Sequence, residues 1–363
     1  GDIEYVRTFS SVGYARVTIP PDDPVAAKVR PDWRLHIYRQ PAGGTLSLEI
    51  VCFLRRFVWE TDEQGRRQLV LQGKGPNDLL NRRIIDRYAE TSGSAAESLE
   101  ADRAMLQVFD YTLGALADFD HDNIARSWAR DLVDAGVIRR QNNITDGPIV
   151  DKKYAWKNAL KVLQDLQAQA RQKGNEVFFG IVPVSPTMLE FRTWTGQPGV
   201  DRSVGSGTSP IVFSLAGGTL ANPSLEYDYS NSRNFIFAGG QGIDDDRKIS
   251  EAFDEERIGL SVFGRSEAFV QASRYSTSDG VAGVAEDEVA RKRPAVILTG
   301  ELPDTPLTPY GGPDGWNLGD RVTLSYQGFQ FDTLVRSVHV RVNPQGRERI
   351  RGRIEADASL IAG

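Results

Sequence analysis

The chain from Glu4 to about Gly75 alternates apolar and polar positions in short runs. The apolar positions of these runs are Val17, Ile19, Leu35, Ile37, Leu46, Leu48 and Ile50. A period of two places alternate side chains on opposite faces of a strand. Residues 20–24 and 41–44, rich in Pro and Gly, interrupt the runs as turn residues do. We therefore expect an antiparallel module of five or six strands here.

The hydrophobic period becomes helical after Asn77. Asn77 can cap a helix in which Leu80, Ile84 and Tyr88 recur at helical spacing. A second helical pattern runs from Met105 to Leu116. The clearest one covers residues 154–173, with Gly174 as its stop. Its apolar stripe consists of Trp156, Leu160, Leu163, Leu166 and Ala170.

The second half of the chain is again mostly strand-like. Residues 177–182 and 188–193 read as a hairpin, and residues 195–209 as an exposed loop. Strands resume at Ile211, Leu225 and Phe235, and a short helix is expected over 281–292. The chain closes with strands expected over 295–298, 321–326, 329–342 and 347–355. This order predicts a β-rich α+β protein rather than a doubly wound sheet.

Two segments near opposite ends of the chain resemble each other. In residues 56–66 and 336–347 a strand runs into a turn that ends in Gln-Gly-Arg, and a second strand follows. Any two hairpins can look this similar. Their positions nevertheless favour two related, barrel-like β modules, which would lie side by side in a ring. Three subunits would then give a pseudo-sixfold ring.

These patterns predict four regions. They are a first β module (1–76), a helical and mixed outer domain (77–210), a mixed β segment (211–294) and a second β module (295–363). A chain of 363 residues should hold two to four domains, at roughly 100–200 residues each.

The last hairpin has one apolar and one basic face. Val338, Val340 and Val342 point to one side, and Ile350 and Ile354 can continue it. The other side carries His339, Arg341, Arg349, Arg351 and Arg353. Such a face is usually only solvated, but arginine's bidentate geometry suits a subunit interface. The four arginines are our candidate interface residues.

Composition argues against stable nucleic-acid binding and against membrane insertion. The chain has 43 Lys and Arg against 49 Asp and Glu, a net charge of −6. Because adhesion to phosphates needs clustered basic residues, DNA would slide past this surface. No apolar stretch reaches the ~20 residues that cross a bilayer. Cys52 is the only cysteine, which excludes an internal disulfide and favours a buried small hydrophobe.

No pattern assembles a catalytic, metal or cofactor site. Residues 118–123 space carboxylates like a calcium loop but lack its central Gly and closing Glu. Residues 244–246, three aspartates, are better interpreted as a solvated turn. Residues 239–242 follow an apolar strand but lack the Lys-Ser/Thr ending of a phosphate loop. His36, His121 and His339 are scattered. We expect no cofactor, no metal and no catalytic residue.

Two other functions stay open. Paired carboxylates for glycoside cleavage can have any spacing in sequence, which leaves a cell-wall or polysaccharide hydrolase. Trp59, Trp156, Trp194 and Trp316 could form a sugar platform in a carbohydrate-binding module. Their spread along the chain favours core and interface packing.

Several longer runs resemble one protein family. Residues 189–202, 220–230, 238–242 and 319–322 resemble the ReqiPepy-type, gene-product-thirty-seven-like tail proteins of long-tailed siphophages. The resemblance extends from about Trp33 to Glu355 and is weakest over 91–146. The family is similar in layout to the central hub proteins of phage baseplates.

The resemblance implies a non-enzymatic, homotrimeric hub at the distal end of the tail of a virion. Its partners would be further copies of itself, the distal tail protein ring, the tape-measure protein and receptor-binding or tip proteins. DNA would only pass through the lumen. The protein would be made and assembled in the host cytoplasm. No catalytic residue is carried over from the family.

Overall fold

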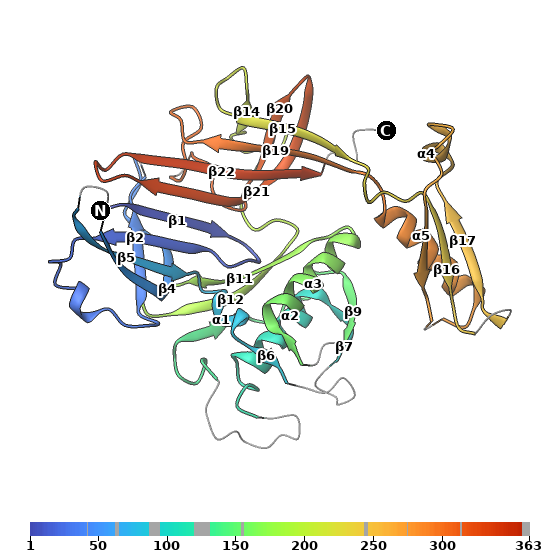
Figure 1. The fold of residues 1–363 in the computed structure, drawn as a ribbon, viewed down its shortest axis with the longest axis horizontal. Helices are drawn as coiled ribbons and strands as arrows, with labels where there is room; N and C mark the ends of the chain where they lie inside the picture. The colour runs from blue at the N-terminus through green and yellow to red at the C-terminus, as the bar shows by residue number, and fades with distance from the viewer. Residues whose placement is uncertain are drawn as a thin grey trace. The chain divides into compact units, whose positions relative to one another are not determined.

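The computed structural model (Figure 1) describes residues 1–41, 43–61, 65–86, 95–119, 131–153, 156–242, 246–273, 275–312 and 314–357. The chain divides into two compact units. Unit 1 comprises residues 1–222 and 300–354, and unit 2 is formed mainly by residues 223–299. The four regions expected from the sequence stay a prediction.

A twelve-stranded sheet contains the strands from both ends of the chain. Its main path runs through β15 (Ala221–Asp228), β19 (Ala295–Pro303), β22 (Glu348–Asp357), β21 (Phe329–Val342), β1 (Ile3–Thr8), β2 (Tyr14–Ile19), β5 (Arg67–Lys74), β4 (Ser47–Thr61) and β3 (Arg34–Arg39). Beside this path, β20 (Arg321–Tyr326) pairs with β21 and with the short strands β13 (Asp201–Arg202) and β14 (Val212–Ser214). A single 3₁₀ turn, Ala26–Lys28, lies between β2 and β3.

The path from β15 to β3 is open, so the described strands do not close into a barrel. The β-rich class with few helices is confirmed. Two separate barrel-like modules are not, because both chain ends contribute to one sheet. Residues 195–209 are also more than an exposed loop, since β13 pairs with β20 in parallel.

Strand β1 joins the two ends of the chain. One of its edges pairs with β2, and the other pairs with β21, from Ile3 opposite Val342 to Thr8 opposite Ser337. Tyr5 and Val340 are neighbours in this register, and both side chains are buried. A slip of one residue would expose them, so burial of this face fixes the register. Figure 1 shows β1 beside β21.

A helical subdomain of unit 1 lies between the two ends. Its elements are α1 (Asp78–Asn81), β6 (Ile84–Ile85), β7 (Ala95–Glu100), α2 (Ala101–Thr112), β8 (Ile138–Arg140), β9 (Ile149–Lys153), β10 (Lys157–Asn158), α3 (Ala159–Gln172), β11 (Val177–Pro183) and β12 (Leu189–Thr195). Helices α2 and α3 pack together and against the β11–β12 hairpin. Phe109 of α2 stacks on Phe191 of β12 with ring centroids 4.8 Å apart.

All three helices expected in this region differ at their ends, and α2 begins before Met105 and ends at Thr112 rather than at Leu116. Residues 78–81 form only one helical turn, because Ile84 and Ile85 pair as a strand with Asn158 and Lys157. Helix α3 begins at Ala159 rather than at 154. Its N-cap is Asn158, whose side chain accepts a hydrogen bond from the Lys161 amide. Trp156 is therefore outside the stripe and exposed. Tyr88 and Tyr154 lie outside the described residues.

Unit 2 contains a three-stranded sheet and two helices. They are β16 (Phe235–Gly239), β17 (Ile249–Phe253), α4 (Glu255–Gly259), β18 (Glu267–Gln271) and α5 (Ser278–Arg291). Strand β16 lies between β17 and β18, and α5 packs against β16 and β17. The expected helix over 281–292 is thus confirmed. The buried core is small and consists of Ile236, Ala238, Ala272, Val281 and Ala285.

No helix in the described ranges is both long and apolar enough to cross a bilayer.

Candidate functional site

The two hairpins that share the Gln-Gly-Arg run have the same geometry. Each belongs to a set of three strands, which we name the first triplet (β3, β4, β5) and the second triplet (β20, β21, β22). In the first triplet, the front half of β4 pairs with β3 and its rear half pairs with β5. In the second, β21 divides in the same way between β20 and β22. The long strand is shared by two partners in both cases.

The registers of β4 with β5 and of β21 with β22 correspond position by position. Trp59 is opposite Leu69 in the first triplet, and Val340 is opposite Ile350 in the second. Val340 follows Trp59 by 281 positions, and Ile350 follows Leu69 by the same number. The same offset relates the β-bulges at Arg55 and Arg336. It also relates the turn residues Gly65 and Gly346, which have φ of +78° and +76°.

A β-bulge bends a strand and increases its twist, and bulges are placed features rather than accidents. The triplets are therefore equivalent structural elements, although most of their side chains differ. Residues 62–64 of the first turn lie outside the described ranges.

The candidate interface arginines lie on the exposed face of the second triplet. Val338, Val340, Ile350 and Ile354 are buried on the opposite face, as the alternation predicted. Arg341 lies opposite Arg349, an arrangement of like charges that costs free energy unless anions compensate it. Arg341 is 3.4 Å from Asp2, and Arg351 is 2.6 Å from Glu301. Arg349 and Arg353 are exposed. Their role at an interface stays a prediction.

Glu4 of β1 partly compensates this basic face. Its Oε1 is 2.8 Å from the His339 Nε2 and accepts a hydrogen bond from the Tyr14 hydroxyl at 2.8 Å. Burial alone would raise the pKa of Glu4, but the hydrogen bonds from Tyr14 and His339 outweigh it and lower that pKa below its ordinary value. Glu4 is thus held as a carboxylate between β2 and β21.

A partly buried polar cluster holds the first triplet, β1 and the loop before β20 together. Arg7 donates from Nη1 to Glu49 Oε1 and to the Tyr310 hydroxyl, each at 2.7 Å. The Tyr310 hydroxyl in turn donates to Glu49. Burial raises the pKa of Tyr310, so its hydroxyl stays protonated and remains a donor. Arg39 of β3 lies over the Tyr310 ring and forms two hydrogen bonds with Glu348 of β22.

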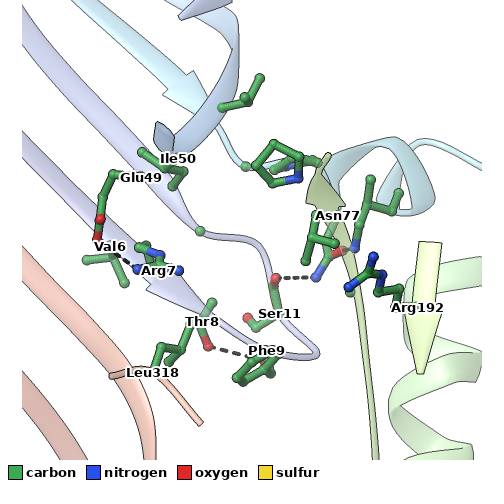
Figure 2. A pocket seen from close by; sticks show the side chains of 18 of the residues that line it. Val6, Arg7, Thr8, Phe9, Ser11, Glu49, Ile50, Asn77, Arg192 and Leu318 are labelled. Carbon is green, nitrogen blue, oxygen red and sulfur yellow. Dashed lines mark hydrogen bonds and ion pairs between the residues drawn. The ribbon is translucent and has the colours of Figure 1, made fainter. Parts of the chain in front are cut away.

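A pocket of unit 1 that is partly open to solvent lies beside this cluster and has a volume of about 410 Å³ (Figure 2). Arg7 and Glu49 line one end of it, and Asn77 and Arg192 line the other. The Asn77 amide donates to the Ser11 carbonyl and accepts from the Ile181 amide, each at 2.8 Å. Asn77 therefore does not cap α1 with its side chain. It bridges the β1–β2 loop to β11.

The family model named Siphovirus ReqiPepy6 Gp37-like protein matches residues 1–354. The chain belongs to this family. In a comparison with curated proteins, none matches it.

Two solved tail proteins have the same fold as this Gp37-like chain. The tail protein from Neisseria meningitidis matches with a TM-score of 0.56 at 11% identity, over 98% of this chain and 92% of that one. The 43 kDa tail protein of prophage MuSo2 from Shewanella oneidensis matches with a TM-score of 0.54 at 10% identity, over 98% and 93%. At these identities the likeness shows the fold.

The other residues that the sequence singled out do not converge on a chemical site. In the described part of the Gp37-like chain, no three His, Cys, Asp or Glu side chains could hold one metal ion. Residues 120–123 of the calcium-like spacing, and Asp244 and Asp245, lie outside that part. A Cβ on Gly240 would approach Val281 to 2.6 Å, so this glycine serves close packing within unit 2. Cys52 is buried, which raises the pKa of its thiol to about 12.

The tryptophans do not form a shared platform for a sugar. Trp316 is fully buried and donates from its ring nitrogen to the Thr308 carbonyl at 2.9 Å. Trp194 packs edge-on against Phe9 with centroids 5.0 Å apart. Packing accounts for both, as the spread of the tryptophans along the chain predicted.

Proposed function

We propose that the protein is a structural hub at the distal end of a phage tail or of a related tail-like particle. Three copies form a ring in which the first and second triplets alternate as six pseudo-equivalent elements. The observation that carries this proposal is the single offset in numbering that relates bulge, register and turn of the two triplets. A chain that presents the same element twice can build a sixfold ring from three subunits.

The family and the fold support a mechanical role. The ring joins the distal tail protein ring to receptor-binding or tip proteins, and it opens for the tape-measure protein and DNA. It acts without catalysis. The net charge of −6 suits a lumen that must not retain DNA. Arg349 and Arg353 are exposed, and Arg349 faces Arg341 across the hairpin. In this assembly these arginines would meet acidic groups of a neighbouring protein.

The mass of the purified full chain tests the ring. Light scattering after size exclusion should give three subunits, and imaging of intact particles should place the protein at the tail tip. Charge reversal of Arg349 and Arg353 to Glu should weaken the assembly. Arg171→Glu, at an exposed position on α3, is the matched control. A chain that stays monomeric at all concentrations and is absent from tail tips would sink the proposal.

A further inference from the structure

The two triplets differ at one edge. In the second triplet, both edges of the rear half of β21 are paired, one with β22 and the other with β1. In the first triplet, the rear half of β4 pairs only with β5, from Arg56 opposite Gln72 to Thr61 opposite Arg67. Strand β3 ends its pairing at Phe53, before the bulge. Within the described ranges, the edge of β4 that corresponds to the β1-bearing edge of β21 has no strand beside it.

The side chains of β4 along this edge are also more exposed than their equivalents in β21. Val338 and Val340 of β21 are completely buried. Their equivalents in β4, Phe57 and Trp59, are 41% and 55% exposed. Yet Phe57 is opposite Leu71 and Trp59 opposite Leu69, and both leucines belong to a buried cluster with Leu54 and Ala26. Phe57 and Trp59 therefore extend a hydrophobic core that is covered on one side only.

An edge of this kind is a template for another strand. It combines unpaired backbone groups with exposed aromatic side chains, and folded proteins normally cover or blunt such edges. The segment from Arg56 to Thr61 contains no proline that would blunt it. Large exposed apolar side chains that continue a core mark a surface that is covered in an assembly.

We propose that the β4 edge from Arg56 to Thr61, with Phe57 and Trp59, is the surface on which a second copy of this chain adds a strand. The second triplet supports this choice of partner, because there the equivalent edge is covered by a strand of this same chain, β1. The proposal rests on the proposed ring and deepens it. The pairing of β1 with β21 within a subunit and the pairing of a strand with β4 between subunits would then be structurally equivalent.

The geometry defines the variants. Phe57→Ser with Trp59→Ser removes both exposed aromatic side chains and should leave the fold intact, since neither is enclosed. Ile149→Ser is the matched control, because Ile149 is also 55% exposed but lies on β9, away from either triplet. Both proteins are compared as full chains by sedimentation over a dilution series. Circular dichroism and thermal unfolding verify that each variant is folded.

We expect the double variant to raise the concentration at which the assembly half-dissociates at least about tenfold, since two aromatic side chains lose burial in each contact. Ile149→Ser should leave it unchanged. A second readout is amide hydrogen exchange. Amides between Arg56 and Thr61 should exchange more slowly in the assembled than in the diluted wild-type protein.

The outcomes separate the two proposals. The inference is overturned, and the hub left in place, if the double variant dissociates at the same concentration as a wild-type trimer and the wild-type amides between Arg56 and Thr61 exchange equally fast when assembled and when diluted. A wild-type protein that is monomeric throughout overturns both. Loss of assembly in the Ile149→Ser control as well would show that the effect is general, and it would also overturn the assignment of this edge.

Discussion

Replacing Asn77 by alanine should destabilise unit 1 by about 2–4 kcal/mol, because it orphans two backbone groups that the side chain now satisfies. The side chain is only 5% exposed, and its amide is both donor to Ser11 and acceptor from Ile181. Alanine leaves a backbone carbonyl and a backbone N–H without these partners, and each buried group so orphaned costs about 1–3 kcal/mol. Ser11 is an exposed residue, so water can compensate its carbonyl in part. The loss of stability is therefore smaller than for two fully buried backbone groups without partners.

Urea unfolding measures this loss. Intrinsic fluorescence reports unfolding through six tryptophans, one of which, Trp194, lines the same pocket as Asn77. The midpoint should fall by roughly 1 M at an unchanged slope, for a slope of about 2–4 kcal/mol per M. Asn77→Asp keeps the acceptor for Ile181 but sets a carboxylate oxygen against the Ser11 carbonyl and buries a charge, so its midpoint should fall at least as far.

The control lies on the same helical turn. The Asn81 side chain is exposed and, among the residues that the structure describes, makes one long contact of 3.5 Å, with Asp78, so Asn81→Ala should change stability by less than about 0.5 kcal/mol. If Asn77→Ala unfolds at the same midpoint as Asn81→Ala, the amide bridge contributes nothing and the reasoning is wrong.

Three further predictions concern side chains of unit 1. Tyr310→Phe removes the hydroxyl that binds Arg7 and Glu49 and should cost about 1–3 kcal/mol in the same urea assay; an unchanged midpoint would show that water replaces it. Glu4→Gln should be less stable than wild type at pH 7. Because the pKa of folded Glu4 lies below its unfolded value, its contribution is present above the unfolded pKa of about 4.3 and is lost as the pH falls through the folded pKa, so the two proteins should converge once the pH is below the folded pKa. A difference that grows on acidification would contradict this sign. Cys52, with its thiol pKa raised to about 12 by burial, should resist alkylation at pH 8 until urea unfolds the sheet, and rapid labelling of the native protein would refute this.

Local patterns in the sequence predicted the strands of the second triplet well. The expected ranges 321–326 and 329–342 coincide with β20 and β21. Apolar and polar residues largely alternate along these strands, although Thr323 is buried together with Val322 and Leu324, and the bulge at Arg336 interrupts β21. The repeated turn was also visible, because only Gly accommodates its positive φ without strain. The deeper equivalence, with a bulge at Arg55 and Arg336, had no signal in a single sequence, because neither position carries a glycine.

The features that the sequence did not predict depend on contacts between residues far apart in the chain. Leu80 and Ile84 have helical spacing, but Ile84 and Ile85 pair with Asn158 and Lys157, which lie far along the chain beyond α2. The bridge by Asn77 to Ile181 was hidden for the same reason, since an asparagine before an apolar run is the usual signal of a cap. The contact of Arg7 with Glu49 and Tyr310 combines three distant segments. None of these pairings leaves a periodicity that a local window can detect.

The pairing of β1 with β21 has a consequence for biosynthesis. Ile3 and Val342 are partners although 339 positions separate them. At about 5–20 residues per second, a ribosome needs roughly 20–70 s to make the second strand after the first. During that time one edge of β1 is open, and an open edge invites pairing with other nascent chains. The sheet can therefore close only late in synthesis, and crowding of ribosomes on one message would favour aggregation over the native joint.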